Sequence, residues 1–219
     1  MAASPRTVTD VESSLKVRAG QLAARRVVQG RRVEMQALAD ELGVSRVTLF
    51  RNGGTREDLL GAALWTITER TLVYALSRSE AQRPSGALHS IGMGREMNAL
   101  VSESTVLHVL LEREPAATIR ILTDPRGHVQ PGVVGFVEDV LRRDMREFGL
   151  VAITDPGDLA FALVRLGESF LYADVLASRR PDVEAANRLQ QALVEAALPA
   201  APRDQPQHEQ GRDDDQLRQ

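Results

Sequence analysis

The residue types best suited to chemistry in this chain lie between Ser45 and Arg51. An arginine such as Arg46 can donate two hydrogen bonds to a guanine, and the methyl groups of Val47 and Thr48 can contact a thymine. Ser45 can cap the N-terminus of a helix, and a short helix with these side chains exposed can lie in the major groove of B-DNA. The chemistry that this stretch suggests is recognition of base edges.

The residues around this stretch have the pattern of a helix-turn-helix. Gly43 can adopt the left-handed conformation that ends a helix, and the small Ala39, four residues earlier, lets a second helix cross closely. Val44 and Leu49 are expected to face inward and hold the two helices at a steep angle. The helix expected before the turn has apolar residues at spacings of three and four: Met35, Leu38, Ala39 and Leu42.

Sequence patterns that would support catalysis are missing. No histidines form a short metal-binding pattern such as HExxH, and no Gly-x-Ser-x-Gly motif or phosphate-binding P-loop occurs. The pair Gly92 and Gly94 lacks the preceding strand and the third glycine of a dinucleotide-binding motif. There is no cysteine, which removes thiolate metal sites and cysteine nucleophiles. We therefore expect no enzymatic activity, no metal and no cofactor.

The elements that position the candidate residues are predicted to be helices. Only 4 % of the 219 residues are aromatic, and apolar residues recur at helical rather than strand spacing. We expect an all-α chain with an N-terminal three-helix helix-turn-helix domain and a larger C-terminal helical bundle. The predicted divisions are a flexible N-terminus (1–10), a DNA-binding domain (11–56), a ligand-binding and dimerisation domain (57–198) and a disordered tail (199–219).

Charge is distributed unevenly along the chain. The net charge is −3, but residues 1–56 hold ten basic and five acidic side chains, so this part is +5 and the remainder is −8. A basic end on an acidic body suggests two separate tasks. No apolar run is long enough to span a bilayer, and the first ten residues lack the apolar stretch of a secretory signal. We expect a soluble, cytoplasmic protein with no membrane partner.

Two helices near the C-terminus are predicted to form a dimer interface. The helix expected over 156–177 is apolar on most of its circumference, so it needs cover on more than one side. With the helix expected over 182–198 it would form a hairpin that pairs with a second copy in a four-helix bundle. The sequence thus predicts a homodimer through 156–178 and 182–198.

A resemblance to a known family rests on the turn and the residues around it. The run Leu-Ala-Asp-Glu-Leu-Gly-Val-Ser-Arg-Val-Thr-Leu-Phe-Arg from Leu38 to Arg51, with Thr-Arg-Glu-Asp-Leu-Leu from Thr55 to Leu60, resembles the N-terminal domain of TetR-family transcriptional regulators. The resemblance covers roughly residues 12–65. It implies an all-helical dimer with three DNA-binding helices and a variable bundle that binds an inducer.

The resemblance also implies roles for single residues. Ser45 would open the recognition helix, and three of its residues, Arg46, Val47 and Arg51, would face bases or nearby phosphates. Thr48 and Phe50 would lie against the DNA backbone, and Arg56 would take the place of a phosphate-contacting lysine.

The chain departs from the family pattern directly after the recognition helix. Phe50 replaces the usual tyrosine and so lacks a hydroxyl donor, while Asn52, Gly53 and Gly54 stand where histidine, phenylalanine and a small residue or proline are usual. Arg51, Asn52 and the glycine amides could replace the missing phosphate contacts. A Phe-Arg-x-x-Gly-x-Arg-Glu stretch is similar to a branch of the family linked with breakdown of acyl-homoserine lactone signals.

Large or polar residues on predicted inward faces of the bundle are candidates for an inducer cavity, with ordinary core filling as the alternative for each. An ionised Glu168 would be costly to bury alone. It could pair with Arg165 or Arg120, accept a ligand hydroxyl, or lie exposed at a dimer edge. The candidate ligand-binding residues are Trp65, Met93, Met97, His108, Phe136, Phe161, Glu168 and Tyr172.

The sequence as a whole predicts a ligand-responsive repressor. Its dimer would bind a pseudo-palindromic operator in double-stranded DNA and be released by a small-molecule inducer, for which a lipophilic compound such as a lactone would be suitable. Two alternatives have no DNA role: a helical small-molecule-binding or enzymatic bundle, and a dimeric interaction protein.

Overall fold

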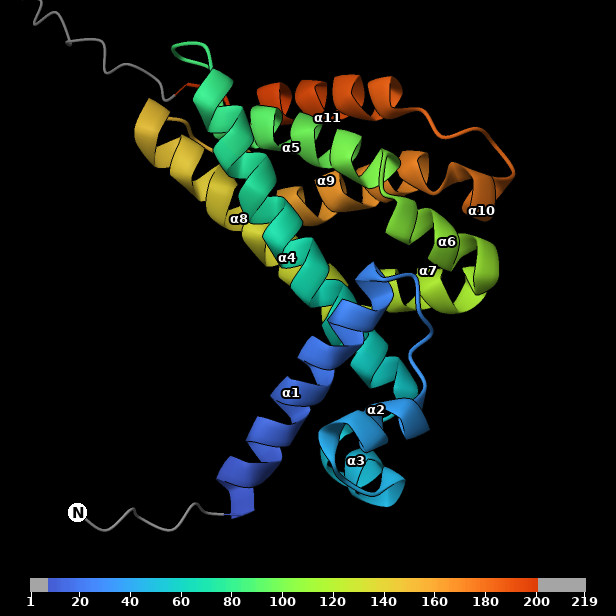
Figure 1. Cartoon of the computed structure of the whole chain (residues 1–219). Helices are drawn as coiled ribbons and strands as arrows, with labels where there is room; N and C mark the ends of the chain where they lie inside the picture. Colours follow the sequence, from blue (N-terminus) through green and yellow to red (C-terminus); the bar gives the residue numbers. More distant parts are fainter. Residues whose placement is uncertain (1–7, 201–219) are drawn as a thin grey trace, which may run out of the picture.

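The computed structural model describes residues 8–200, which form a small head and a larger bundle joined by one long helix (Figure 1). Within this range there are eleven helices, and the β-structure is confined to one isolated bridge between Leu150 and Ala200. The head contains α1 (Val8–Val28), α2 (Met35–Leu42) and α3 (Arg46–Gly53). The bundle contains α4 (Arg56–Gln82), α5 (His89–Ser102), α6 (Thr105–Arg113), α7 (Pro115–Thr123), α8 (Val129–Phe148), α9 (Pro156–Leu171), α10 (Ala173–Ala177) and α11 (Val183–Ala197).

The head forms around side chains that α1 to α4 contribute to one buried cluster. Leu38, Ala39 and Leu49 are fully buried, as the helix-turn-helix pattern predicts, and Val44 packs against them. Gly53 is buried where α3 meets α1, and a Cβ atom there would lie 2.9 Å from Leu49 Cδ1. Because Gly53 has no side chain, α3 can pack closely on α1 without displacing Leu49.

The head continues into the bundle without a break in the core. Helix α4 has 27 residues and is therefore about 40 Å long, so it lies in both parts. The buried cluster that holds Leu49 also contains Leu111, Leu122 and Tyr172 from the bundle. A movement of α6 or α7 therefore acts on the same packed side chains that support the head.

The predicted helix over 156–177 is interrupted at one position. Helix α9 ends at Leu171 and α10 begins at Ala173, with Tyr172 between them at φ −107° and ψ 23°. The Tyr172 side chain is buried at this bend, whereas Leu176 of α10 is exposed. The change of direction thus keeps the aromatic ring in the core while the chain turns to the surface.

The ends of the described range differ from the predicted divisions. Helix α1 begins at Val8, inside the segment expected to be flexible, and residues 1–7 lie outside the described range. The amide of Val151 donates a 3.0 Å hydrogen bond to the Pro199 carbonyl, so the first residues of the expected tail pair with the α8–α9 connection. Residues 201–219 of that tail lie outside the described range.

None of the helices between residues 8 and 200 combines the length and the apolar composition that crossing a bilayer requires.

Candidate DNA-binding helix and ligand pocket

The turn before α3 has the predicted geometry. Gly43 lies in the left-handed region at φ 69° and ψ 32°, and the Val44 amide donates to the Ala39 carbonyl at 3.0 Å. The Ser45 hydroxyl then caps α3 by accepting a 3.0 Å hydrogen bond from the Thr48 amide. These short-range contacts set the start and the direction of α3.

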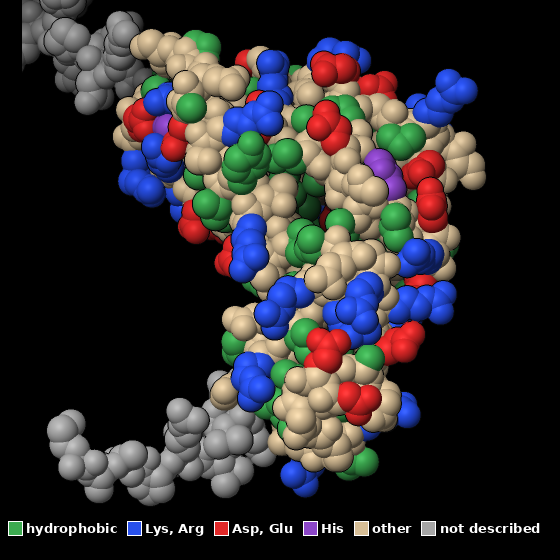
Figure 2. Space-filling view, viewed as in Figure 1, with side chains coloured by type: hydrophobic (Ala, Val, Ile, Leu, Met, Phe, Trp, Pro, Cys, Tyr) green, Lys and Arg blue, Asp and Glu red, His purple; other side chains and the backbone are tan. Residues whose placement is uncertain are grey.

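Helix α3 lies at the end of the molecule away from the bundle and presents most of its predicted contact residues to solvent (Figure 1). Val47 is 75 % exposed and Phe50 60 % exposed, and Arg46 and Arg51 are exposed beside them. Figure 2 shows basic side chains across the visible face of the head, with acidic ones between them. An exposed pair of large apolar residues between two arginines is suited to a surface that another molecule covers.

Four of the predicted DNA-contacting residues form two hydrogen bonds with one another along α3 and its N-cap. The hydroxyl groups of Thr48 and Ser45 are 2.8 Å apart, and the Arg51 Nε donates to the Asn52 Oδ1 at 3.3 Å. Both contacts are at the surface, so they orient the polar groups without removing them from solvent.

The expectation for Arg56 does not agree with the structure. Its Nε donates to the Val33 carbonyl at 2.9 Å, and its two terminal nitrogens donate to the Glu114 carboxylate at 2.7 and 3.0 Å. Glu114 precedes α7, so this guanidinium is turned toward the bundle and its donors are used within the chain. A planar guanidinium matches a carboxylate in this two-bond geometry, which the family's lysine could not reproduce. Arg56 is thus a link between head and bundle.

Two more polar contacts join the head to the bundle close to Arg56. The Arg113 Nη1 donates to the Gly30 carbonyl at 3.0 Å, and Arg120 of α7 pairs at 2.5 Å with Glu57 in the first turn of α4, where α4 leaves the head. The loop between α1 and α2 is therefore held through two of its carbonyls, those of Gly30 and Val33, by arginines.

The turn between α3 and α4 depends on a reciprocal cap. Asp58 Oδ2 accepts from the Thr55 amide at 2.8 Å, while the Asp58 amide donates to the Thr55 hydroxyl at 3.1 Å. The hydrogen bond from the Thr55 amide is the main cause that lowers the pKa of Asp58 below its ordinary value, and the Thr55 hydroxyl adds to it. Gly54 has φ 97°, and a Cβ atom there would lie 2.9 Å from Asp58 Oδ2.

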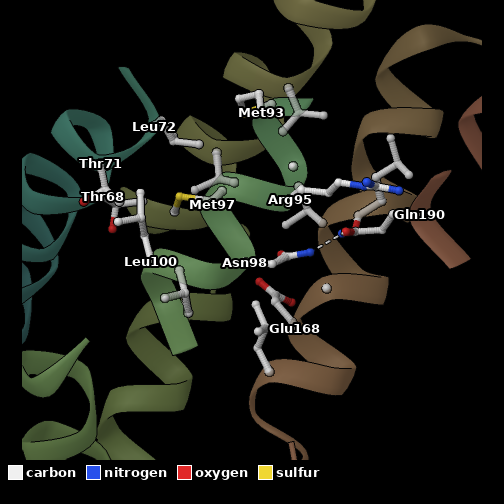
Figure 3. A pocket seen from close by; sticks show the side chains of 18 of the residues that line it. Thr68, Thr71, Leu72, Met93, Arg95, Met97, Asn98, Leu100, Glu168 and Gln190 are labelled. Atoms are coloured by element: carbon white, nitrogen blue, oxygen red, sulfur yellow. Dashed lines mark hydrogen bonds between the residues drawn. The ribbon is translucent and has the colours of Figure 1, made fainter. Parts of the chain in front are cut away.

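The bundle contains a cavity of about 190 Å³ that is partly open to solvent. Aliphatic and methionine side chains from α4, α5, α6, α8 and α9 form most of its wall, and α11 contributes polar residues at one side (Figure 3). An apolar cavity with a few converging polar groups is the usual form of a small-molecule site.

Half of the predicted ligand residues line this cavity: Met93, Met97, Glu168 and Tyr172. The other four lie elsewhere, and for them the expectation is corrected. Trp65 and Phe136 fill the core, and a Cβ atom on Gly132 would lie 2.3 Å from the Trp65 ring, so the indole occupies the space that this glycine leaves. His108 is exposed on α6 and Phe161 is 49 % exposed on α9, so both face away from the cavity.

Sequence reasoning missed the polar side of the cavity. Asn98 is only 4 % exposed and donates to Asn187 Oδ1 at 2.8 Å and to Gln190 Oε1 at 2.7 Å. The Gln190 Nε2 in turn donates to the Leu163 carbonyl at 2.9 Å. Asn98 lies on the same helix face as Gly94 and Val101, which also line the cavity. A polar residue on an inward face needs a hydrogen-bond partner because it is buried, so this position was the sequence signal that could have identified Asn98.

Glu168 pairs with Arg165, which is one of the possibilities that the sequence left open. Its Oε2 lies 2.6 Å from the Arg165 Nη1, and only 12 % of the Glu168 side chain is exposed, whereas Arg120 pairs with Glu57. Burial raises the pKa of Glu168, and the Arg165 charge opposes that rise. Burial likewise raises the pKa of the Tyr172 hydroxyl, and the nearby Glu168 adds to that rise.

Comparisons with known proteins agree with the helix-turn-helix and the bundle. Residues 85–195 match the family model described as the Tetracyclin repressor-like C-terminal domain. The solved structure of the transcriptional repressor QsdR from the TetR family, of R. erythropolis, is 30 % identical, with a TM-score of 0.75 over 83 % of this chain and 95 % of that one. The chain belongs to the TetR family.

Two further solved structures are more distantly similar. A protein described in work on the control of antibiotic production by a bacterial hormone is 19 % identical, with a TM-score of 0.44 over 89 % of this chain and all (100 %) of that one. A regulator of Mesorhizobium loti assigned to the TetR family is 16 % identical, with a TM-score of 0.44 over 87 % of this chain and 96 % of that one. No curated protein matches the chain.

Proposed function

We propose that this TetR-family regulator is a dimeric repressor that reads its operator with α3 and is released when a small molecule fills the bundle cavity. The observation that carries the proposal is the exposed, capped helix α3, which holds Arg46, Val47, Phe50 and Arg51 on the surface of the head. Helices of this kind enter the major groove and contact base edges with a few side chains.

A dimer would present two such helices to one duplex. The two copies of α3 must lie about 34 to 36 Å apart to meet successive major grooves. Phe161 on α9 and Leu189 on α11, which is 47 % exposed, supply the outward apolar surface for the pairing predicted through 156–178 and 182–198. Leu193, by contrast, packs in the core between α8, α9 and α11.

The inducer would occupy the bundle cavity, whose apolar wall fits a lipophilic compound such as a lactone. The branch similarity of the stretch from Phe50 to Glu57 supports a place in the branch linked with acyl-homoserine lactone breakdown. A ligand that prefers one dimer geometry by about 1 to 3 kcal/mol would change DNA affinity roughly 5- to 150-fold.

Footprinting on DNA upstream of the protein's own gene tests the proposal. We expect protection of a two-fold symmetric site that weakens with added salt, because phosphate contacts release counterions. Arg46→Ala or Arg51→Ala should lower the affinity about tenfold, since an arginine contact to a base is worth about 1 to 3 kcal/mol. Arg126→Ala is the matched control, because Arg126 is exposed on the bundle. Protection that neither α3 substitution weakens would show that α3 is not the reader.

A further inference from the structure

One residue in the wall of the bundle cavity has a buried amide without a partner in the described part of the chain. Gln130 lies in the first turn of α8, is only 5 % exposed and lines the cavity. We infer that the Gln130 amide donates a hydrogen bond to an uncharged carbonyl oxygen of the ligand. This inference rests on the proposed role of the cavity as a ligand site, and it adds the residue that recognises the ligand and the place of the ligand's polar group.

The Gln130 side chain has unused hydrogen-bonding capacity. Its amide offers two donor hydrogens and an acceptor oxygen, and none of them pairs with another group between residues 8 and 200. The Ser90 hydroxyl also lacks a partner there, but it has almost no accessible surface, whereas the Gln130 amide is not closed off in this way. A buried amide without a partner is costly, so Gln130 is suited to a group that a ligand supplies.

The polar groups on the α11 side of the cavity differ from Gln130. The Asn98 amide donates to Asn187 and Gln190, and the exposed Arg95 donates to Gln191. Asn187 and Gln190 retain amide hydrogens, but both residues are half-buried, so water can satisfy these hydrogens in the empty cavity. A ligand gains less by replacing such a water than by supplying a partner to a group in apolar surroundings.

Gln130 lies at the end of the cavity that is nearest to the head. Its neighbour Val129, together with Leu122 and Tyr172, lines the cavity and belongs to the buried cluster that also holds Leu49 of α3. A ligand carbonyl at Gln130 would therefore lie beside the side chains that support the head. The Tyr172 hydroxyl is a second donor in the wall, and its contribution is measured separately below.

The charges in the cavity wall favour an uncharged ligand group. Among the described residues, the charged side chains that line the cavity are Arg95 and Glu168, and Arg165 already pairs with Glu168. An amide donor satisfies a carbonyl oxygen, but it compensates poorly for the lost hydration of a carboxylate. A lactone, an ester or an amide thus fits Gln130 better than a fatty acid does.

The remainder of the wall accommodates an apolar chain. Met93, Met97 and Leu100 line this part of the cavity (Figure 3). The volume of about 190 Å³ is somewhat larger than the roughly 150 Å³ cavity that holds benzene in another protein. A small ring with a short chain is therefore a suitable probe.

Calorimetric titration of the full chain with matched probes tests the inference. γ-Octalactone and 2-butyltetrahydrofuran share the ring oxygen and the butyl chain, and they differ in the carbonyl oxygen alone. The lactone should bind about three- to tenfold more tightly than the ether, the usual range for one hydrogen bond, and more tightly than octanoate. Equal or tighter binding of the ether or of octanoate would overturn the inference, and so would a failure of the lactone to bind.

The variant Gln130→Leu assigns this preference to one side chain. It should lower the affinity for the lactone to that for the ether and leave the affinity for the ether unchanged. Because a leucine has no polar group to satisfy, the variant should not lower the thermal midpoint of the empty protein. A clear loss of thermal stability would show that the amide already has a partner, and an unchanged preference for the lactone would show that another group binds the carbonyl. Either result would overturn the inference.

Two further variants complete the comparison. Thr71→Val is the matched control, because Thr71 also lines the cavity but its hydroxyl already donates to the Ile67 carbonyl at 2.9 Å. The preference for the lactone should persist in this variant. In Tyr172→Phe the preference should fall less than in Gln130→Leu, and a larger fall would overturn the assignment of Gln130 as the main donor.

Footprinting in parallel separates failure of this inference from failure of the proposed function. Loss of DNA protection in Arg51→Ala, together with an unchanged lactone preference in Gln130→Leu, would leave the repressor and remove only the proposed contact. The expected lactone preference without any DNA protection would do the reverse.

Discussion

At the scale of single residues, the turn from α3 into α4 shows how few side chains hold α3 at its angle. Gly54 and the pair Thr55 and Asp58 make that turn, and the Asp58 carboxyl group accepts from the Thr55 amide and the Thr55 hydroxyl more strongly when it is ionised. The lowered pKa of Asp58 is the sign of that preference. The angle of α3 thus depends on one charged residue, Asp58, which lies in α4 and not on the exposed face of α3.

We predict that Asp58→Asn destabilises the protein at neutral pH by roughly 0.5 to 1 kcal/mol, the usual worth of such a cap. Because the folded pKa of Asp58 is lowered, its stabilisation is fully present above the unfolded pKa of about 3.8 and is lost as the pH falls through the folded value. Thermal unfolding of both proteins from pH 7 down to pH 3 measures this. A stability difference that stays constant over this range would contradict the prediction.

At the scale of elements, α6 and α7 connect the bundle cavity to the head. Val106 and Leu107 of α6 line the cavity, and the junction between α6 and α7 holds Glu114, the partner of Arg56. Arg113, the residue before it, holds the carbonyl of Gly30. A ligand that shifts α6 would therefore pull on the loop between α1 and α2 through two side chains.

We predict that Glu114→Gln loosens this loop. Loss of the carboxylate charge weakens the hold on Arg56, which also binds the Val33 carbonyl, so amide hydrogen exchange in residues 29–34 should become several-fold faster. Mass spectrometry of the exchange measures it, and Glu112→Gln, at an exposed position near the end of α6, should leave it unchanged. Equal exchange in the Glu114 variant and the parent protein would show that the ion pair does not hold the loop.

At the scale of the whole molecule, the outward face of α9 and α11 is the surface through which we propose that two copies pair. A large aromatic such as Phe161 in contact with water is an unfavourable feature unless a partner covers it. An interface of this type is shared symmetrically, so each side chain meets its own region in the second copy.

We predict that Leu189→Glu converts the dimer into a monomer, because two added charges would face each other across the two-fold axis. Light scattering after gel filtration gives the mass directly. Val73→Glu is the control, since Val73 is comparably exposed on α4, away from the proposed interface, and this variant should remain dimeric. Leu189→Glu is preferable to a charge at Leu193, which would disturb the core. A stable Leu189→Glu dimer would place the interface elsewhere.

The helix-turn-helix and the caps around it can be predicted from residue types, because those contacts join residues at most five positions apart. Gly43, Ser45 and Asp58 act on neighbours within one or two turns, so their residue types are sufficient to indicate the local backbone. The partner of Arg56, which lies 58 positions away, could not be predicted in this way, and neither could the polar end of the cavity, where Asn98 meets a residue 89 positions away. Such contacts depend on how each helix is rotated against its neighbours, and the packing of the whole core sets that rotation.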